Sequence, residues 1–132
     1  MIKKSLFPLA LGGFGIGMTE FVMMGILPDI ATGLHISIPQ AGYLISAYAL
    51  GVVVGAPTLV ALMAGRPPRS VLIWFMLMFA AFNALSALAP NFGMMMASRF
   101  LAGLPHGAFF GVGAVVASRL ADPGKVAAAL AT

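Results

Sequence analysis

Residues 92–118 read FGMMMASRFLAGLPHGAFFGVGAVVAS, and this stretch decides the fold. Apolar and small side chains fill it almost completely, and Arg99 is its single charged residue. An apolar run of about 18 residues or more indicates a helix that spans a membrane. At about 1.5 Å per residue this run is longer than a hydrocarbon core of about 30 Å. We therefore expect this helix to be tilted in the membrane, or kinked at Pro105.

Similar runs precede this stretch in the chain. Together they predict four helices, at about residues 6–27, 40–64, 70–88 and 92–118. Pro28 is expected to close the first helix, residues 28–39 to form a loop, and Pro90 with Asn91 to form a tight turn. Residues 126–132 resemble the opening turns of a fifth helix, with a frayed tail as the alternative. The predicted fold class is an all-α integral membrane protein.

Composition supports a lipid environment. Of the 132 residues, 61% are hydrophobic and only 8% are charged, whereas a soluble domain carries about 25% charged residues. The seven Lys and Arg residues form no basic run with interleaved aromatic residues, which argues against nucleic-acid binding. There is no cysteine, no P-loop and no nucleophile motif. We expect a lipid bilayer as the partner, and no enzyme activity, metal or cofactor.

The basic residues also predict the orientation in the membrane. Lys3 and Lys4 could begin a secretory signal, but the apolar run continues to Pro28 and no cleavage motif ends it. Residues 28–39 and 89–91 contain no Lys or Arg, so both loops are expected to face outward. Six basic residues lie outside the helices and on the opposite side: Lys3, Lys4, Arg66, Arg69, Arg119 and Lys125. Both ends of the chain are then cytoplasmic.

Small residues recur at four-residue spacing, which is typical of close contacts between helices in membranes. They occur in three of the four predicted helices, at Gly13 and Gly17, at Gly51 and Gly55, and at Gly103, Gly107 and Gly111. The helix at 70–88 has no glycine stripe and is bulky all round, so we expect it on the outside of the bundle, facing lipid.

Two charges lie at membrane depth, where a charge costs about 2.5 to 3.5 kcal/mol on insertion scales. Glu20 lies eight residues before Pro28, and Arg99 lies nine residues after Pro90, so both are expected at nearly one level. A direct or water-mediated pair between them would be either a structural ion pair or a site for protons or substrate. His106 follows Arg99 by seven residues and is expected on the same helix face, as a proton relay or as an ordinary hydrogen-bonded side chain.

Sequence motifs surround these charges. In the first helix Thr19 and Glu20 precede Pro28, with the acidic residue eight positions before the proline. In the second helix residues 47–51 read AYALG and residues 55–57 read GAP. In the fourth helix the motif residues are Arg99, Gly103, His106 and Gly107.

In combination these motifs resemble the major facilitator superfamily, specifically the bacterial drug and sugar efflux permeases of the arabinose-efflux type. The resemblance covers essentially all 132 residues. It implies an N-terminal fragment with four of twelve helices, in the bacterial cytoplasmic (inner) membrane, whose partners are the remaining helices. It also implies a proton-coupled antiporter that exports small molecules, in which the arginine of the fourth-helix motif, here Arg99, takes part in proton coupling. Together with Glu20 and His106, identified above from depth and helix face, Arg99 is the expected proton-coupling set. Arg66 and Arg69 match the cytoplasmic loop motif, but Gly65 replaces its acidic residue and Pro68 its glycine; in the fourth helix Ala102 replaces a common glutamine.

Two other functions remain open at this point. One is a complete four-helix antiporter resembling the small multidrug resistance family and acting as a dimer, although the charge bias argues against insertion in both orientations. The other is a membrane scaffold subunit in which Glu20 and Arg99 form a structural lock.

Overall fold

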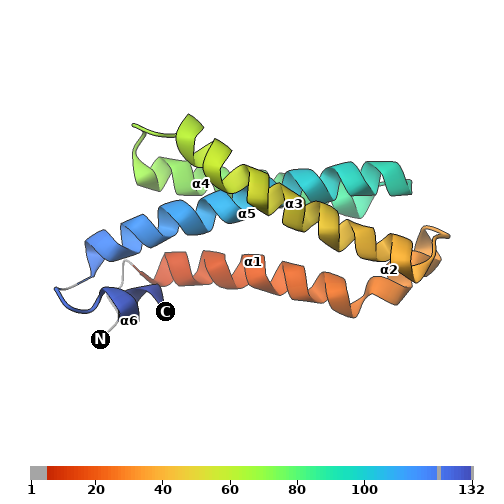
Figure 1. The fold of residues 1–132 in the computed structure, drawn as a ribbon, viewed down its shortest axis with the longest axis horizontal. Coiled ribbons are helices and arrows are strands. Elements are labelled where there is room, and N and C mark those ends of the chain that lie inside the picture. The colour runs from red at the N-terminus through yellow and green to blue at the C-terminus, as the bar shows by residue number, and fades with distance from the viewer. Residues whose placement is uncertain (1–5, 122, 132) are drawn as a thin grey trace.

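The computed structural model describes residues 6–121 and 123–131. In this part of the chain every regular element is a helix (Figure 1). The helices are α1 (Phe7–Gly25), α2 (Leu27–Gly33), α3 (Ile38–Leu62), α4 (Pro68–Leu88), α5 (Phe92–Leu120) and α6 (Val126–Leu130). Among the described residues α1, α3, α4 and α5 are long and apolar enough to cross a membrane. The all-α membrane fold predicted from the apolar runs is confirmed.

The connection after the first helix differs from the prediction. Helix α1 ends at Gly25, before Pro28, and the segment expected to be a loop contains the short helix α2. Pro28 lies in the first turn of α2, where its missing N–H group costs nothing because first-turn N–H groups have no partner within the helix. The proline therefore starts a helix instead of closing one, and the loop shrinks to residues 34–37.

Helix α3 begins two residues earlier than predicted because its first turn is capped. The N–H of Gln40 donates to Ser37 Oγ at 3.2 Å, and the N–H of Ser37 donates to Gln40 Oε1 at 2.9 Å. This reciprocal capping box satisfies N–H groups that the helix leaves unpaired. At the same end of the bundle (Figure 1), Asn91 caps α5 by accepting the N–H of Met94 at 2.9 Å.

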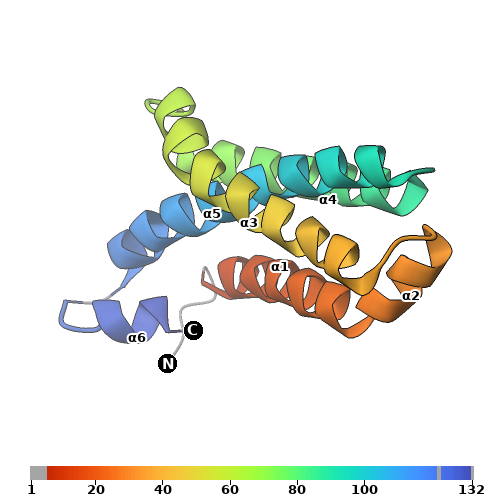
Figure 2. The same ribbon diagram turned by 45° about the vertical axis from the view of Figure 1, so that its right-hand side comes forward.

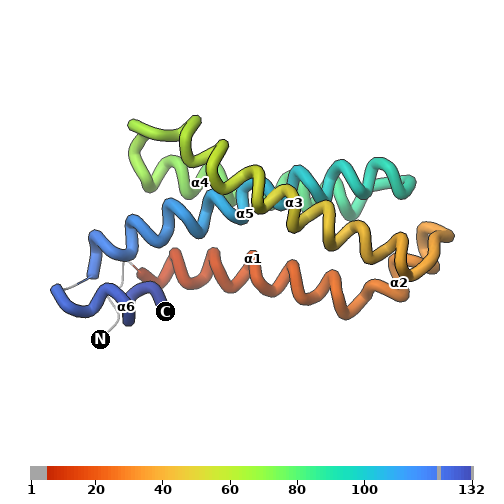
Figure 3. The backbone as a smooth tube through the Cα atoms, in the orientation of Figure 1, coloured from red at the N-terminus to blue at the C-terminus, as the bar shows by residue number. Residues whose placement is uncertain are grey.

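The long helices run up and down, and α5 lies at the centre of the bundle. It packs extensively against α3 and α4, and much less against α1 (Figures 1 and 2). The two halves of α5 run in slightly different directions in Figure 3, on either side of Pro105, which lies inside the helix. Helix α6 lies at the same end of the bundle as the start of α1, and it begins where the fifth helix was expected.

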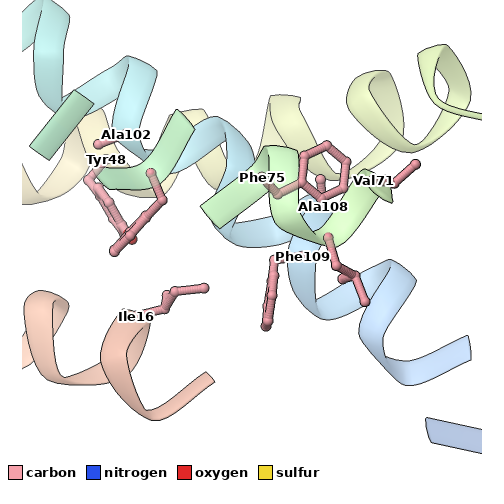
Figure 4. Close-up of a cluster of buried hydrophobic side chains, with 9 residues drawn as sticks. Ile16, Tyr48, Val71, Phe75, Ala102, Ala108 and Phe109 are labelled. Atoms are coloured by element: carbon pink, nitrogen blue, oxygen red, sulfur yellow. The ribbon is translucent and has the colours of Figure 1, made fainter. Parts of the chain in front are cut away.

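The core lies where α5 meets the other helices. Phe75 and Val71 of α4 and Tyr48 of α3 are buried there, together with Ala102, Ala108 and Phe109 of α5. Figure 4 shows Ile16 reaching from α1 toward this cluster and Phe109 pointing from α5 toward α1. Helix α4 buries one face against α5 and exposes large side chains on the other, including Ile73, Trp74 and Leu77. It is thus a peripheral helix with one packed face.

Candidate functional site

The deepest charge in the described residues is Arg99, on α5. Its side chain is only 3% exposed. Its Nη1 donates to Asn83 Oδ1 of α4 at 3.3 Å, and its Cζ lies 4.4 Å from the centroid of the Tyr48 ring of α3. The ring face attracts the cation at this distance. The buried Nε has no hydrogen-bond partner among the described residues, so the protein surrounds this cation with neutral groups and leaves it incompletely satisfied.

Tyr48 connects Arg99 to His106, which lies two turns further along α5. The Tyr48 hydroxyl and His106 Nδ1 are 2.7 Å apart, a short hydrogen bond between α3 and α5. The ring of His106 lies 5.5 Å from that of Tyr48 and 5.2 Å from that of Phe110, centroid to centroid. Arg99 and His106 therefore reach the same tyrosine, as their seven-residue spacing suggested.

Glu20, on α1, lies on the other side of this group. Its side chain is half-buried, and its charge acts electrostatically on Arg99, Tyr48 and His106. Within the described part of the chain, however, the Glu20 carboxylate accepts no hydrogen bond and Arg99 has no carboxylate at salt-bridge distance. The direct pair considered from the sequence is therefore not formed. The reason is geometric. The guanidinium of Arg99 contacts Asn83 and the Tyr48 ring instead, and α1 packs only loosely on α5.

Two residues of this site were assigned no role from the sequence. Asn83 looked like an ordinary helix residue, but its Nδ2 donates to the Phe79 carbonyl at 2.8 Å, which turns Oδ1 toward Arg99. Tyr48 belongs to the AYALG motif at residues 47–51, and its side chain is 1% exposed. Both lie on buried stripes at helical spacing, Tyr48 with Gly51 and Gly55, and Asn83 with Phe79 and Ser86. Those stripes are the sequence signal that could have revealed them.

The glycines explain why α3 and α5 come so close. A Cβ at Gly103 would collide with the Tyr48 carbonyl oxygen, one at Gly51 with the Phe100 carbonyl oxygen, and one at Gly55 with the Leu104 backbone. At Gly107 a Cβ would lie 2.6 Å from the Val52 carbonyl oxygen. Only glycine permits this backbone-to-backbone contact, which brings Tyr48 within reach of Arg99 and His106.

The other predicted packing glycines are less confined. A Cβ at Gly13 would lie 3.3 Å from the Phe110 ring, and one at Gly111 would lie 3.6 Å from Val60. A Cβ at Gly17 would meet nothing within 4 Å, so the packing contact expected there is not met among the described residues. Apolar grooves lie beside α1 instead. One of about 350 Å³ between α1, α5 and α6 is lined by Gly13, Phe109 and Phe110, and one of about 730 Å³ reaches α4 and Arg69.

Arg66 lies in the connection between α3 and α4, Arg69 lies in the first turn of α4, and both are exposed. Gly65 has a φ angle of 83°. It lies at the position where the cytoplasmic loop motif of the resembling family has an acidic residue. This left-handed conformation favours glycine and would strain an aspartate. Among the described residues no three His, Cys, Asp or Glu side chains lie close enough together to hold a metal ion. Lys3 and Lys4, used for the orientation, lie outside the described residues.

Comparison of this sequence with known proteins identifies the family to which the chain belongs. Residues 9–132 match the sequence profile of the Major Facilitator Superfamily. The chain is 53% identical over 131 residues to the inner membrane transport protein YdhP of Escherichia coli strain K12, covering 99% of this chain and 34% of YdhP. A second protein of that strain, AraJ, is 46% identical over 130 residues, which cover 98% of this chain and 33% of AraJ.

A chloramphenicol resistance protein of Streptomyces lividans is 39% identical over 126 residues, which cover 96% of this chain and 32% of that protein. The chain thus spans about a third of the length of these relatives. No solved structure matches it. The four apolar helices and the inner membrane relatives agree with a multi-pass protein of the bacterial inner membrane. From the profile match and these relatives, this chain belongs to the major facilitator superfamily of transporters, with efflux-type relatives.

Proposed function

We propose that these residues form the first four spanning helices of a proton-coupled antiporter that exports small molecules. The observation that carries the proposal is the buried guanidinium of Arg99, which has no carboxylate partner among the described residues while Glu20 lies on the loosely packed helix opposite. A buried cation without a counter-ion is a poor device for stability, and charges at membrane depth are functional candidates.

Glu20 is the proposed proton carrier. A carboxylate holds its proton more weakly as a positive charge comes closer, and more tightly as it loses contact with water. If α1 shifts against α5 during transport, both the distance from Glu20 to Arg99 and its access to water change. The proton affinity of Glu20 then depends on conformation, which is the requirement for coupling a proton gradient to transport.

His106 is the proposed second exchangeable group. Imidazole gains and loses a proton near physiological pH, and His106 feels the charge of Glu20 while it contacts Tyr48. Arg99 tunes both groups without exchanging a proton itself, because a guanidinium stays charged in proteins. No metal, cofactor or covalent step takes part in this scheme.

The exported molecules are proposed to be small drugs, sugars or metabolites. The relative named for chloramphenicol resistance supports a drug, and the apolar groove beside Phe109 and Phe110 supports an apolar ligand. The rest of the transporter, about two thirds of the relatives' length, would complete the substrate cavity.

Both ends of this segment are proposed to be cytoplasmic. Arg66 and Lys125, which lie outside the spans, and Arg69 in the first turn of α4 support this orientation together with the uncharged turn at residues 89–91. A cysteine replacing Ser37 should react with an impermeant maleimide added outside intact cells, and one replacing Arg66 only after the cells are opened. Equal labelling of Ser37→Cys from both sides would contradict the orientation and favour a dual-topology dimer.

The experiment for the proposed function compares two carboxylates in the full-length transporter in proteoliposomes. Glu20→Gln should abolish uphill export driven by a pH gradient, with chloramphenicol as the first probe, while the folded yield stays at the wild-type level. Asp29→Asn is the matched control because Asp29 is exposed on α2; it should export at the wild-type rate. Export by Glu20→Gln at the wild-type rate would refute Glu20 as the coupling site.

A further inference from the structure

Tyr48 contacts two partners through two different parts of its side chain. Its hydroxyl lies 2.7 Å from His106 Nδ1, and the face of its ring lies 4.4 Å from Arg99 Cζ. The side chain is 1% exposed, and close contact between α3 and α5 at Gly51 and Gly103 fixes its backbone. One buried tyrosine thus touches both Arg99 and His106 of α5.

The chemistry of the two groups determines the direction of the hydrogen bond. A neutral imidazole has one nitrogen that donates and one that accepts. A phenol hydroxyl is a good donor, and an unprotonated imidazole nitrogen is a better acceptor than a phenol oxygen. In neutral His106 the Tyr48 hydroxyl therefore donates to Nδ1, and the ring proton resides on Nε2.

Protonation of His106 must reverse this bond. Both nitrogens of an imidazolium donate, so Nδ1–H would then donate to the Tyr48 oxygen and the hydroxyl hydrogen would turn away. The ring that carries this hydroxyl is the one on which Arg99 rests. A change of charge at His106 therefore acts on the group that holds the guanidinium.

The surroundings of His106 contain few other groups that could set its tautomer. Among the described residues, Glu20 of α1 acts on it through space and Tyr48 of α3 through the hydrogen bond. Arg99 of its own helix is linked to it through the Tyr48 ring, and α4 contributes the neutral Asn83 through Arg99. Phe110 contacts the imidazole ring without a hydrogen bond. Among the described residues only Tyr48 forms a hydrogen bond with either ring nitrogen.

The geometry points to Tyr48 as a positioning residue that fixes His106 in the Nε2–H tautomer and links its protonation to Arg99. The tautomer assignment stands on the contacts above. The role in transport rests on the proposed function, in which His106 exchanges a proton.

The tautomer can be observed by solid-state NMR of the full-length protein in lipid bilayers, with histidine labelled by ¹⁵N in the ring. The His106→Gln variant identifies the His106 signals by their loss. Wild-type protein at alkaline pH should show the proton on Nε2. Tyr48→Phe keeps the ring under Arg99 but removes the hydroxyl, and it should give a mixture of both tautomers.

The matched control is Tyr43→Phe, because Tyr43 lies on the same helix and is 57% exposed. It should leave the His106 signals unchanged. A proton on Nδ1 in the wild type, or an unchanged Nε2–H tautomer in Tyr48→Phe, would overturn the assignment.

Transport provides the second readout. Tyr48→Phe should move the curve of export against pH by roughly half to one pH unit, the equivalent of one hydrogen bond, while Tyr43→Phe superimposes on wild type. Tyr48→Leu also removes the ring under Arg99 and should lower export at every pH. An unchanged curve in Tyr48→Phe despite a changed tautomer would overturn the link to transport. A failure of the Glu20→Gln test leaves the NMR result standing, so the two proposals fail separately.

Discussion

Two of the interfaces of helix α5, those with α3 and with α1, have opposite character. Against α3 the contact is backbone to backbone, and glycines such as Gly51 and Gly103 leave no room for a methyl group. Against α1 the contact is sparse: a Cβ at Gly17 would meet nothing within 4 Å, and a groove of about 350 Å³ lies alongside. The spacing between α3 and α5 is fixed by these backbone contacts. The spacing between α1 and α5 can change without a backbone collision.

The site is divided between these interfaces. Tyr48, Arg99 and His106 belong to the tight pair α3 and α5, and they form one connected group. Glu20 belongs to α1 and acts on that group only through space. This division suggests a rigid part that presents fixed charges and a movable part that carries the exchangeable proton.

Gly103→Ala should produce the largest effect of a minimal substitution. The added methyl group would collide with the Tyr48 carbonyl oxygen, so α3 and α5 must separate. We expect a loss of about 3 kcal/mol or more, seen as a loss of folded protein in detergent. Gly17→Ala is the matched control and should be neutral or stabilising, because alanine favours the helix by about 1 kcal/mol and the space there is open. Equal yields for the two variants would remove the distinction between the interfaces.

Arg99→Ala should have an intermediate effect on stability. It removes the contact with the Tyr48 ring and leaves Asn83 Oδ1 without its donor, a loss of about 2 kcal/mol. Combined with Glu20→Gln in a double-mutant cycle, it should show a coupling energy in stability below about 0.5 kcal/mol, since no ion pair links the two residues. Neither single variant nor the double variant should export. A coupling energy above about 1 kcal/mol, or rescue in the double variant, would instead support a structural lock.

The rigid pair could be anticipated from the sequence better than the movable part. Gly51, Gly55, Gly103 and Gly107 share a spacing that only close helix contact explains, and the structure places all four between α3 and α5. Such stripes are informative because a glycine interface depends on one face of each helix, which the period of 3.6 residues determines.

The contacts across helices were harder to predict. Their positions along the helices predicted that Glu20 and Arg99 lie at one depth in the membrane. Whether two side chains form a hydrogen bond also depends on the rotation of each helix about its axis, and in a lipid environment an apolar composition does not indicate that rotation. Arg99 contacts Asn83 and Tyr48 instead. Asn83 belongs to no motif, and Tyr48 lies in the AYALG motif, which did not indicate a contact with Arg99. The short helix α2 was missed for a local reason, because a proline both ends and begins helices.

The most direct test of the account is a pair of distance measurements by double electron–electron resonance in the full-length transporter. Spin labels on cysteines at Leu50 and Val115 report on α3 and α5, and labels at Met18 and Val115 report on α1 and α5; all three positions are exposed. Between alkaline and acidic pH the first distance distribution should stay unchanged and the second should shift, and Glu20→Gln should abolish that shift. A constant distance between α1 and α5, or a change between α3 and α5, would contradict a proton carrier on a movable helix.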